Sequence, residues 1–92
     1  MKTIKVGMSI ITDIESNKCE LGYYILAFGN ETDPNTYGIM IKCRLCNSDR
    51  EMLETTCDLT SSYDEAEGWV RMMAAREVGP VSLHEIVDEL VG

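Results

Sequence analysis

Two short helical patterns in the last third of the chain, residues 62–77 and 82–91, constrain its fold most. Each has apolar side chains at three- and four-residue intervals, which places them on one face of a helix. These side chains are Ala66, Trp69, Val70 and Met73 in the first pattern, and Leu83, Ile86, Val87, Leu90 and Val91 in the second. Isolated helices this short are marginal in water, so both must dock their apolar faces on another part of the chain.

Both patterns carry start signals, and the first also carries a stop signal. Ser62 and Ser82 are each followed three residues later by a glutamate, the capping-box spacing that favours a helix N-terminus. Gly79 and Pro80 predict the end of the first helix, because glycine suits a left-handed cap and proline cannot continue the backbone ladder. Gly68 interrupts the first pattern at a cost of up to about 1 kcal/mol relative to alanine, and we expect it to let the helix backbone approach a sheet.

Four stretches of alternating side chains precede these helices. They predict strands at residues 3–14, 20–29, 36–46 and 51–59. Because strands followed by helices indicate an α+β fold, we expect a four-stranded antiparallel sheet with both helices packed on one face. The length of 92 residues suits a single domain spanning residues 1–92.

The alternation also assigns faces to the first and fourth strands. The inward side chains are predicted to be Ile4, Val6, Met8 and Ile10 in the first strand and Leu53, Thr55, Cys57 and Leu59 in the fourth, where Glu54, Thr56 and Asp58 point outward. Residues that pair across strands share a face, so inward residues must pair with inward residues. One register that satisfies this rule pairs Ile41 with Cys57 and Arg44 with Glu54, and we adopt it as the prediction.

The second strand is apolar on both faces. Tyr23, Ile25 and Ala27 alternate with Tyr24, Leu26 and Phe28. The pattern indicates either a central strand covered on both sides or a patch that is left for a partner. With Met40 beside Tyr24, such a patch predicts a homodimer formed through the sheet, since two-fold dimers are the commonest assemblies.

The charge is strongly acidic and confined to one half of the chain. The formal net charge is −8; residues 1–50 hold six acids and six bases, and residues 51–92 hold ten acids and two bases. Direct binding to nucleic acid is disfavoured, because affinity for phosphates comes mainly from lysine and arginine. Attraction to a basic protein surface is favoured, and the alternative is a solvated, solubilising surface.

The acidic half supplies the candidate binding residues. They are Glu51, Glu54 and Asp58 on the fourth strand, and Asp64, Glu65, Glu67, Glu85, Asp88 and Glu89 on the helices.

One cysteine spacing invites a metal hypothesis. Cys43 and Cys46 form a C-x-x-C pair that could share a zinc ion, with Cys19, Cys57 or His84 completing a tetrahedral set. Against zinc, a second C-x-x-C is missing, and residues three apart on a strand point to opposite faces. We therefore expect no cofactor and keep zinc as an alternative.

The sequence offers little for catalysis. His84 is the only histidine, and no serine or cysteine nucleophile is placed beside it by sequence. The chain also lacks a glycine-rich phosphate loop. We expect a protein that is not an enzyme.

No membrane span or signal peptide is expected. The apolar stretch near the start is broken by Lys5, Ser9 and Asp13. These features predict a cytoplasmic protein with reduced cysteines.

Two short motifs resemble a family of short uncharacterised clostridial proteins. They are Tyr37-Gly38-Ile39 before an alternating strand, and Gly79-Pro80-Val81-Ser82-Leu83 leading into Ile86-Val87-Asp88-Glu89-Leu90. The resemblance covers most of residues 20–91. That family is a domain of unknown function, so the resemblance implies a bacterial or phage origin and no activity. The C-x-x-C pair is not part of the pattern, which makes the cysteines local to this protein.

Three functional hypotheses follow. The first is a small acidic protein–protein interaction module, in its most specific form an inhibitor that presents carboxylates to the nucleic-acid-binding surface of a bacterial enzyme. Phage-encoded anti-CRISPR proteins that mimic DNA are similar in size and acidity. The alternatives are a homodimer formed through the apolar sheet face and a zinc module based on Cys43 and Cys46.

Overall fold

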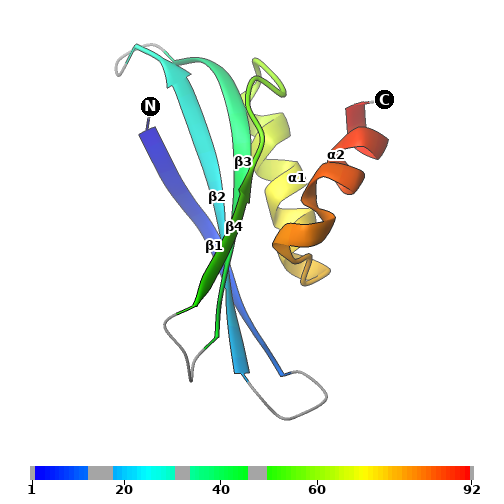
Figure 1. The fold of residues 1–92 in the computed structure, drawn as a ribbon. Coiled ribbons are helices and arrows are strands. Elements are labelled where there is room, and N and C mark those ends of the chain that lie inside the picture. Colours follow the sequence, from blue (N-terminus) through cyan, green and yellow to red (C-terminus); the bar gives the residue numbers. More distant parts are fainter. Residues whose placement is uncertain (1, 13–17, 31–33, 46–49, 92) are drawn as a thin grey trace.

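The structure, a computed structural model, describes residues 2–12, 18–30, 34–45 and 50–91. It is an antiparallel sheet in the order β1-β2-β3-β4, followed by two helices on one face of that sheet (Figure 1). The elements are β1 (Lys2–Thr12), β2 (Lys18–Gly29), β3 (Pro34–Leu45), β4 (Glu51–Thr55), α1 (Tyr63–Ala75), the short 3₁₀ helix η1 (Pro80–Ser82) and α2 (Leu83–Val91). The predicted α+β class and four-stranded antiparallel sheet are confirmed. The predicted strand ends at residues 13–14 and 46 lie outside the described residues.

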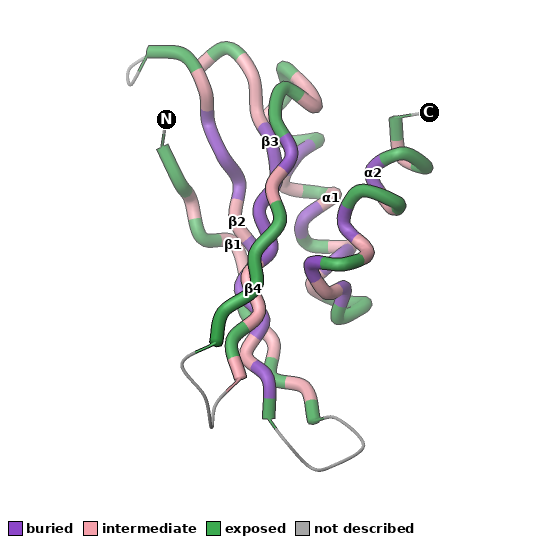
Figure 2. Tube along the Cα trace, in the orientation of Figure 1, coloured by how far each residue is buried: buried purple, intermediate pink, exposed green. Residues whose placement is uncertain are grey.

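The core lies between the sheet and the helices. Its side chains come from the two central strands and from the facing sides of the helical segments (Figure 2). The fully buried members are Leu21, Tyr23, Ile25, Ile39, Ile41, Val70, Met73 and Leu83. The prediction that residues 20–29 form a central strand is confirmed, because β2 pairs with β1 on one side and β3 on the other.

Tyr23 joins the sheet to the helical layer by a polar contact as well as by packing. Its side chain is fully buried, and its hydroxyl donates a hydrogen bond of 2.8 Å to the backbone carbonyl of Val78, in the segment between α1 and η1. A buried hydroxyl and a buried carbonyl each need a partner, and this bond satisfies both. The contact therefore fixes where the chain leaves α1 and turns toward α2.

The first helix begins as expected but ends differently. The Ser62 hydroxyl accepts a 3.2 Å hydrogen bond from the Glu65 amide, so the predicted N-cap is confirmed. The left-handed residue after α1 is Glu77, with φ of 55°, whereas Gly79 has φ of −89°. The expected glycine cap is wrong: the Val78 amide donates to the Met73 carbonyl at 3.0 Å and closes the helix two residues earlier.

The second helix, α2, begins at Leu83, one residue after its predicted start, and a one-turn 3₁₀ helix precedes it. Pro80 opens the 3₁₀ helix η1, and α2 follows it directly from Leu83. Ser82 therefore lies inside a helical turn instead of at an N-cap. Proline is favoured in a first turn because its missing amide has no helical partner there.

A bulge in β1 changes which side chains face the helices. The pairing with β2 shifts between Lys5 and Gly7, so the alternation is reset at Val6. Ile4 and Val6 pack against the core as expected, but Met8 and Ile10 point to the opposite, open face of the sheet and are about half exposed. The predicted inward positions of Met8 and Ile10 are wrong, because strict alternation does not survive an extra residue.

The register of β4 also differs from the prediction. Ile41 pairs with Glu54, and Arg44 pairs with Glu51. The expected pairs of Ile41 with Cys57 and of Arg44 with Glu54 are wrong. Glu54 therefore lies on the helix side of the sheet, and Leu53 lies on the open face with 50% of its surface exposed.

Thr56 explains this register. The Thr56 side chain is buried, and its hydroxyl accepts a 3.1 Å hydrogen bond from the Ile39 amide. The regular ladder of β4 ends at Thr55, and Thr56 continues the attachment to β3 with its side chain. The pattern predicted Thr56 outward and Cys57 inward, but Cys57 is exposed. The prediction placed both side chains wrongly because it considered only which of the two residues is more apolar.

Two glycines provide a matched test of this packing. A methyl group on Gly38 would run into the backbone carbonyl of Thr56, whereas one on Gly68 would meet nothing within 4 Å. Gly68 thus does not mediate the close approach expected of it. We expect Gly38→Ala to lower the free energy of unfolding by about 1–3 kcal/mol or more, and Gly68→Ala to raise it by up to about 1 kcal/mol. Urea denaturation of both variants measures the difference, and equal stabilities would contradict the register of β4.

Tyr23 gives a second prediction. Tyr23→Phe leaves the Val78 carbonyl without its partner, so the free energy of unfolding should fall by about 1–3 kcal/mol. Tyr24→Phe, a half-buried position on the open face, is the matched control and should stay within about 0.5 kcal/mol of the parent. Denaturation at neutral pH compares the two, and a larger loss in the control would contradict the assigned role of Tyr23.

The same residue predicts a loss of stability at alkaline pH. Burial, with smaller contributions from Glu77 and Cys43, raises the pKa of Tyr23 from 10.0 to about 12. Between these values the unfolded chain releases the phenolic proton first, so stability is fully present below pH 10 and is lost as pH rises toward 12. The loss attributable to Tyr23 should be about 2–3 kcal/mol, measured as the difference between parent and Tyr23→Phe across this window. A parallel decline of both proteins would contradict it.

Candidate interaction surface

Six of the nine candidate carboxylates lie on the two helices. We call this set the acidic helix layer: Asp64, Glu65, Glu67, Glu85, Asp88 and Glu89. Because α1 and α2 cover the same face of the sheet, the set belongs to a single layer of the molecule (Figure 1). All six are exposed except Glu67, which is half-buried.

The carboxylates of α2 are the least neutralised part of this layer. Leu83 and Val87 are buried against the core, which turns Glu85, Asp88 and Glu89 outward at helical spacing. The helix contains no lysine or arginine, so no base within α2 offsets these charges. The result is a short, exposed, negatively charged helix surface.

Glu67 on α1 is engaged by its neighbours. Its carboxylate lies 3.4 Å from Arg71 one turn later, an exposed pair of the kind worth at most about 1 kcal/mol. Burial raises the pKa of Tyr63, and the charge of Glu67 and a hydrogen bond to Glu67 raise it further. Glu67 therefore already interacts with Arg71 and Tyr63 on its own helix. Its carboxylate is less available to a partner protein than the exposed carboxylates of the same layer.

The three carboxylates of the fourth strand do not join the helix layer. Glu51 pairs across the sheet with Arg44 on the open face. Asp58, just beyond β4, accepts a 2.6 Å hydrogen bond from the Thr36 hydroxyl. Glu54 faces the helices, but its Oε2 lies 3.1 Å from Nε2 of His84. These three side chains are therefore spread over different parts of the surface.

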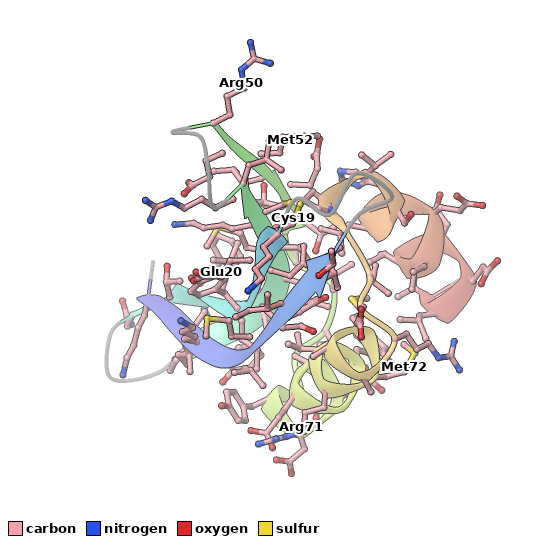
Figure 3. All side chains as sticks on the ribbon, turned by 90° about the horizontal axis from the view of Figure 1, so that it is seen from below. Cys19, Glu20, Arg50, Met52, Arg71 and Met72 are labelled. Carbon is pink, nitrogen blue, oxygen red and sulfur yellow. The ribbon has the colours of Figure 1, made fainter. Side chains whose placement is uncertain are left out.

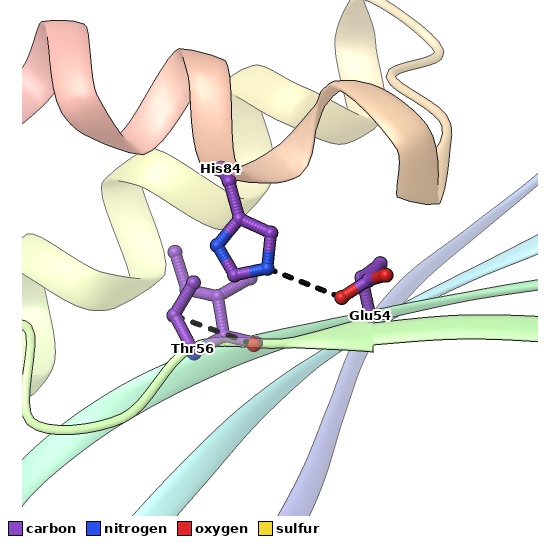
Figure 4. A network of polar contacts seen from close by, with 4 residues as sticks. Glu54, Thr56 and His84 are labelled. Atoms are coloured by element: carbon purple, nitrogen blue, oxygen red, sulfur yellow. Dashed lines mark hydrogen bonds and ion pairs between the residues drawn. The ribbon is translucent and has the colours of Figure 1, made fainter.

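The pair of His84 and Glu54 attaches α2 to β4 (Figure 4). Sequence reasoning left His84 without a partner, because Glu54 lies 30 residues away and was assigned to the other face of the strand. Both side chains are substantially exposed, His84 by 60% and Glu54 by 48%. The Thr56 hydroxyl, also drawn in Figure 4, is bonded to the Ile39 backbone. The pair therefore serves as a surface contact between helix and sheet.

The open face of the sheet has a different character. Met8, Ile10 and Leu53 are each about half exposed there. Lys42, on the same face, places its ammonium 5.4 Å from the centre of the Tyr24 ring, within reach of a cation–π contact. Lys42 and Arg44 thus lie on the side of the sheet opposite the carboxylates of the helices.

The cysteines are arranged differently from the predicted zinc set. Among the described residues, no group of three or more histidine, cysteine, aspartate or glutamate side chains could hold a metal ion. Cys46 lies outside the described residues, so its part in the C-x-x-C hypothesis is not decided. Cys57 is exposed, whereas Cys19 is buried beside Cys43. Burial raises the pKa of Cys43, and the charge of Cys19 and a hydrogen bond to Cys19 add to this.

The described part of the chain contains no helix that is both long and apolar enough to cross a membrane.

Comparison with known protein families gives a match over the whole chain. The chain belongs to the Family of unknown function (DUF6514), whose model matches residues 1–92. The resemblance inferred from the motifs near Tyr37 and Gly79 is confirmed to the extent that it named a family of unknown function. No curated protein and no solved structure matches the chain.

Proposed function

We propose that this member of a family of unknown function is a small acidic protein–protein interaction module whose acidic helix layer binds a basic protein surface. The observation that carries the proposal is the placement of six carboxylates on one layer, three of them on a helix without lysine or arginine. A surface of one charge sign attracts an oppositely charged partner and raises the rate of encounter.

The most specific form of this proposal is an inhibitor that occupies the nucleic-acid site of a bacterial enzyme. Carboxylates on exposed helices can take the place of backbone phosphates, and the net charge of −8 keeps the chain away from nucleic acid itself. Anti-CRISPR proteins that mimic DNA provide the analogy in size and acidity. A partner of this kind would release the protein when duplex DNA or high salt is added.

The first experiment is a pull-down from bacterial lysate with the tagged protein, washed at low and at high salt, with the bound proteins identified by mass spectrometry. We expect one basic nucleic-acid-binding enzyme that is retained at low salt and lost at high salt. Recovery of no partner would favour the alternative that the carboxylates are solubilising charge.

A pair of double variants tests the surface itself. Glu85→Gln with Glu89→Gln removes two charges from the acidic helix layer, and Glu20→Gln with Glu51→Gln removes two from the sheet. The helix variant should bind the recovered partner roughly tenfold more weakly, since each exposed charge contributes up to about 1 kcal/mol. It should also show a smaller salt dependence of the association rate. Surface plasmon resonance measures both, and equal effects of the two variants would refute the assigned surface.

A second candidate function is homodimerisation through the open face of the sheet. It is favoured by the half-exposed Met8, Ile10 and Leu53 on that face. The same face carries the cross-strand pair of Arg44 and Glu51, so both charge signs are available for a self-complementary two-fold contact.

The dimer predicts an association that hardly depends on salt. Leu53→Asp should convert it to monomer, because the substitution buries a charge in the contact. Val81→Asp is the control, at an exposed position on η1, which packs on the other side of the sheet from the open face. Analytical ultracentrifugation at high protein concentration compares the two variants with the parent. A parent protein that stays monomeric would rule this function out.

A further inference from the structure

We propose that Cys19, Cys43 and Met52 form a binding site for a soft monovalent metal ion of the Cu(I) type. The site would lie on the helix side of the sheet, at the end of the strands that the helices leave uncovered. It is independent of the interaction surface proposed above and uses none of its carboxylates.

The register places the three residues on one face of three adjacent strands, with Cys43 between the other two. Cys43 on β3 pairs directly with Met52 on β4, so the two side chains share a face. Cys43 also pairs with Leu21 on β2, and Cys19 lies two residues before Leu21 on the same face. Cys19 is thus the diagonal neighbour of Cys43 on the adjacent strand, close enough for the two thiols to interact.

The position at the sheet end makes the site accessible. The strands extend beyond α1 and α2 toward the ends near residues 12, 18 and 45 (Figure 1). Figure 3 views the molecule from this end and labels Cys19 and Met52. A cavity of about 370 Å³ opens there and is lined by Cys43, Leu45, Arg50, Glu51 and Met52. Met52 is 56% exposed and Cys19 is 8% exposed, so an ion would enter from the Met52 side.

A direct disulfide is a poorer explanation for the two cysteines. Diagonal neighbours on adjacent strands have Cα atoms roughly 7–8 Å apart, and a disulfide usually needs less than about 7 Å. The bond would therefore require backbone movement in the centre of the sheet, between β2 and β3. Two thiols held close but not bonded are instead well placed to share an ion between them.

The ligand types select the class of metal. Thiolate and thioether sulfur are soft ligands and favour Cu(I), whereas magnesium and calcium favour oxygen. A structural zinc site takes four ligands in a tetrahedral arrangement, and the three sulfur atoms here fall short of that number. Each thiol gives its proton to solvent when its sulfur binds the ion, so binding releases two protons and strengthens as the pH rises.

The test is a titration of the reduced full-length protein with Cu(I) under anaerobic conditions, in competition with a chromogenic Cu(I) chelator. We expect one ion per chain, release of two protons, and an ultraviolet absorption band from thiolate-to-copper charge transfer. Cys43→Ser and Cys19→Ala should each abolish stoichiometric binding. Met52→Leu removes one ligand and should weaken it by roughly tenfold or more, at least the loss seen when a residue that only orients a ligand is removed.

Two further variants serve as controls. Met8→Leu changes a methionine of similar exposure on the open face, and Cys57→Ser removes an exposed thiol outside the cluster. Both should bind Cu(I) as the parent does. Circular dichroism checks folding, and Cys43→Ser, at a half-buried position, decides the test if Cys19→Ala does not fold.

Two results would overturn the proposal. One is the absence of stoichiometric Cu(I) binding by the parent. The other is binding that Cys46→Ser abolishes and Cys19→Ala leaves intact, with zinc retained in preference to Cu(I). That second result would assign the metal to the C-x-x-C pair.

Discussion

Burial of Tyr23 between the sheet and the helical layer is the contact on which the rest of this structure depends. Its ring lies in the core of the central strand β2, and its hydroxyl holds the carbonyl of Val78 where the chain turns from α1 toward α2. Neither helix is long enough to be stable alone. The anchored turn holds both helices on the same face of the sheet. Apolar packing alone would fix the position of the helices less precisely.

That docking gives the molecule two unlike sides. The buried stripe of α2, with Leu83 and Val87, directs its carboxylates outward, so the acidic half of the sequence becomes a surface layer. The opposite face keeps apolar side chains and bases, including Lys42 over Tyr24. Because the helices do not reach the far end of the strands, Cys43 and Met52 remain accessible there. Each proposed function depends on one of these three regions.

The predicted elements were close to those observed, and the errors concern faces. Strict alternation placed Met8 inward, but a bulge after Lys5 reversed the second half of β1. The preference for apolar residues inside placed Cys57 inward, but Thr56 is buried because its hydroxyl bonds to the Ile39 backbone. A single extra residue reverses every position after it, and one wrong assignment of a position shifts a whole strand to the other face, since side chains on a strand alternate with a period of two.

By itself, the sequence determined the order of strands and helices, the apolar stripes of the helices, the Ser62 cap and the concentration of acid in the second half. These are local properties, set by periodicity, capping and composition over short windows. Only the tertiary structure decided the strand register, the pairing of Glu54 with His84, the division of the carboxylates and the placement of Cys19, Cys43 and Met52 on one face of adjacent strands. These features involve residues that lie far apart in the sequence. Their arrangement depends on bulges and on tertiary packing, which cannot be inferred from any short stretch of the sequence.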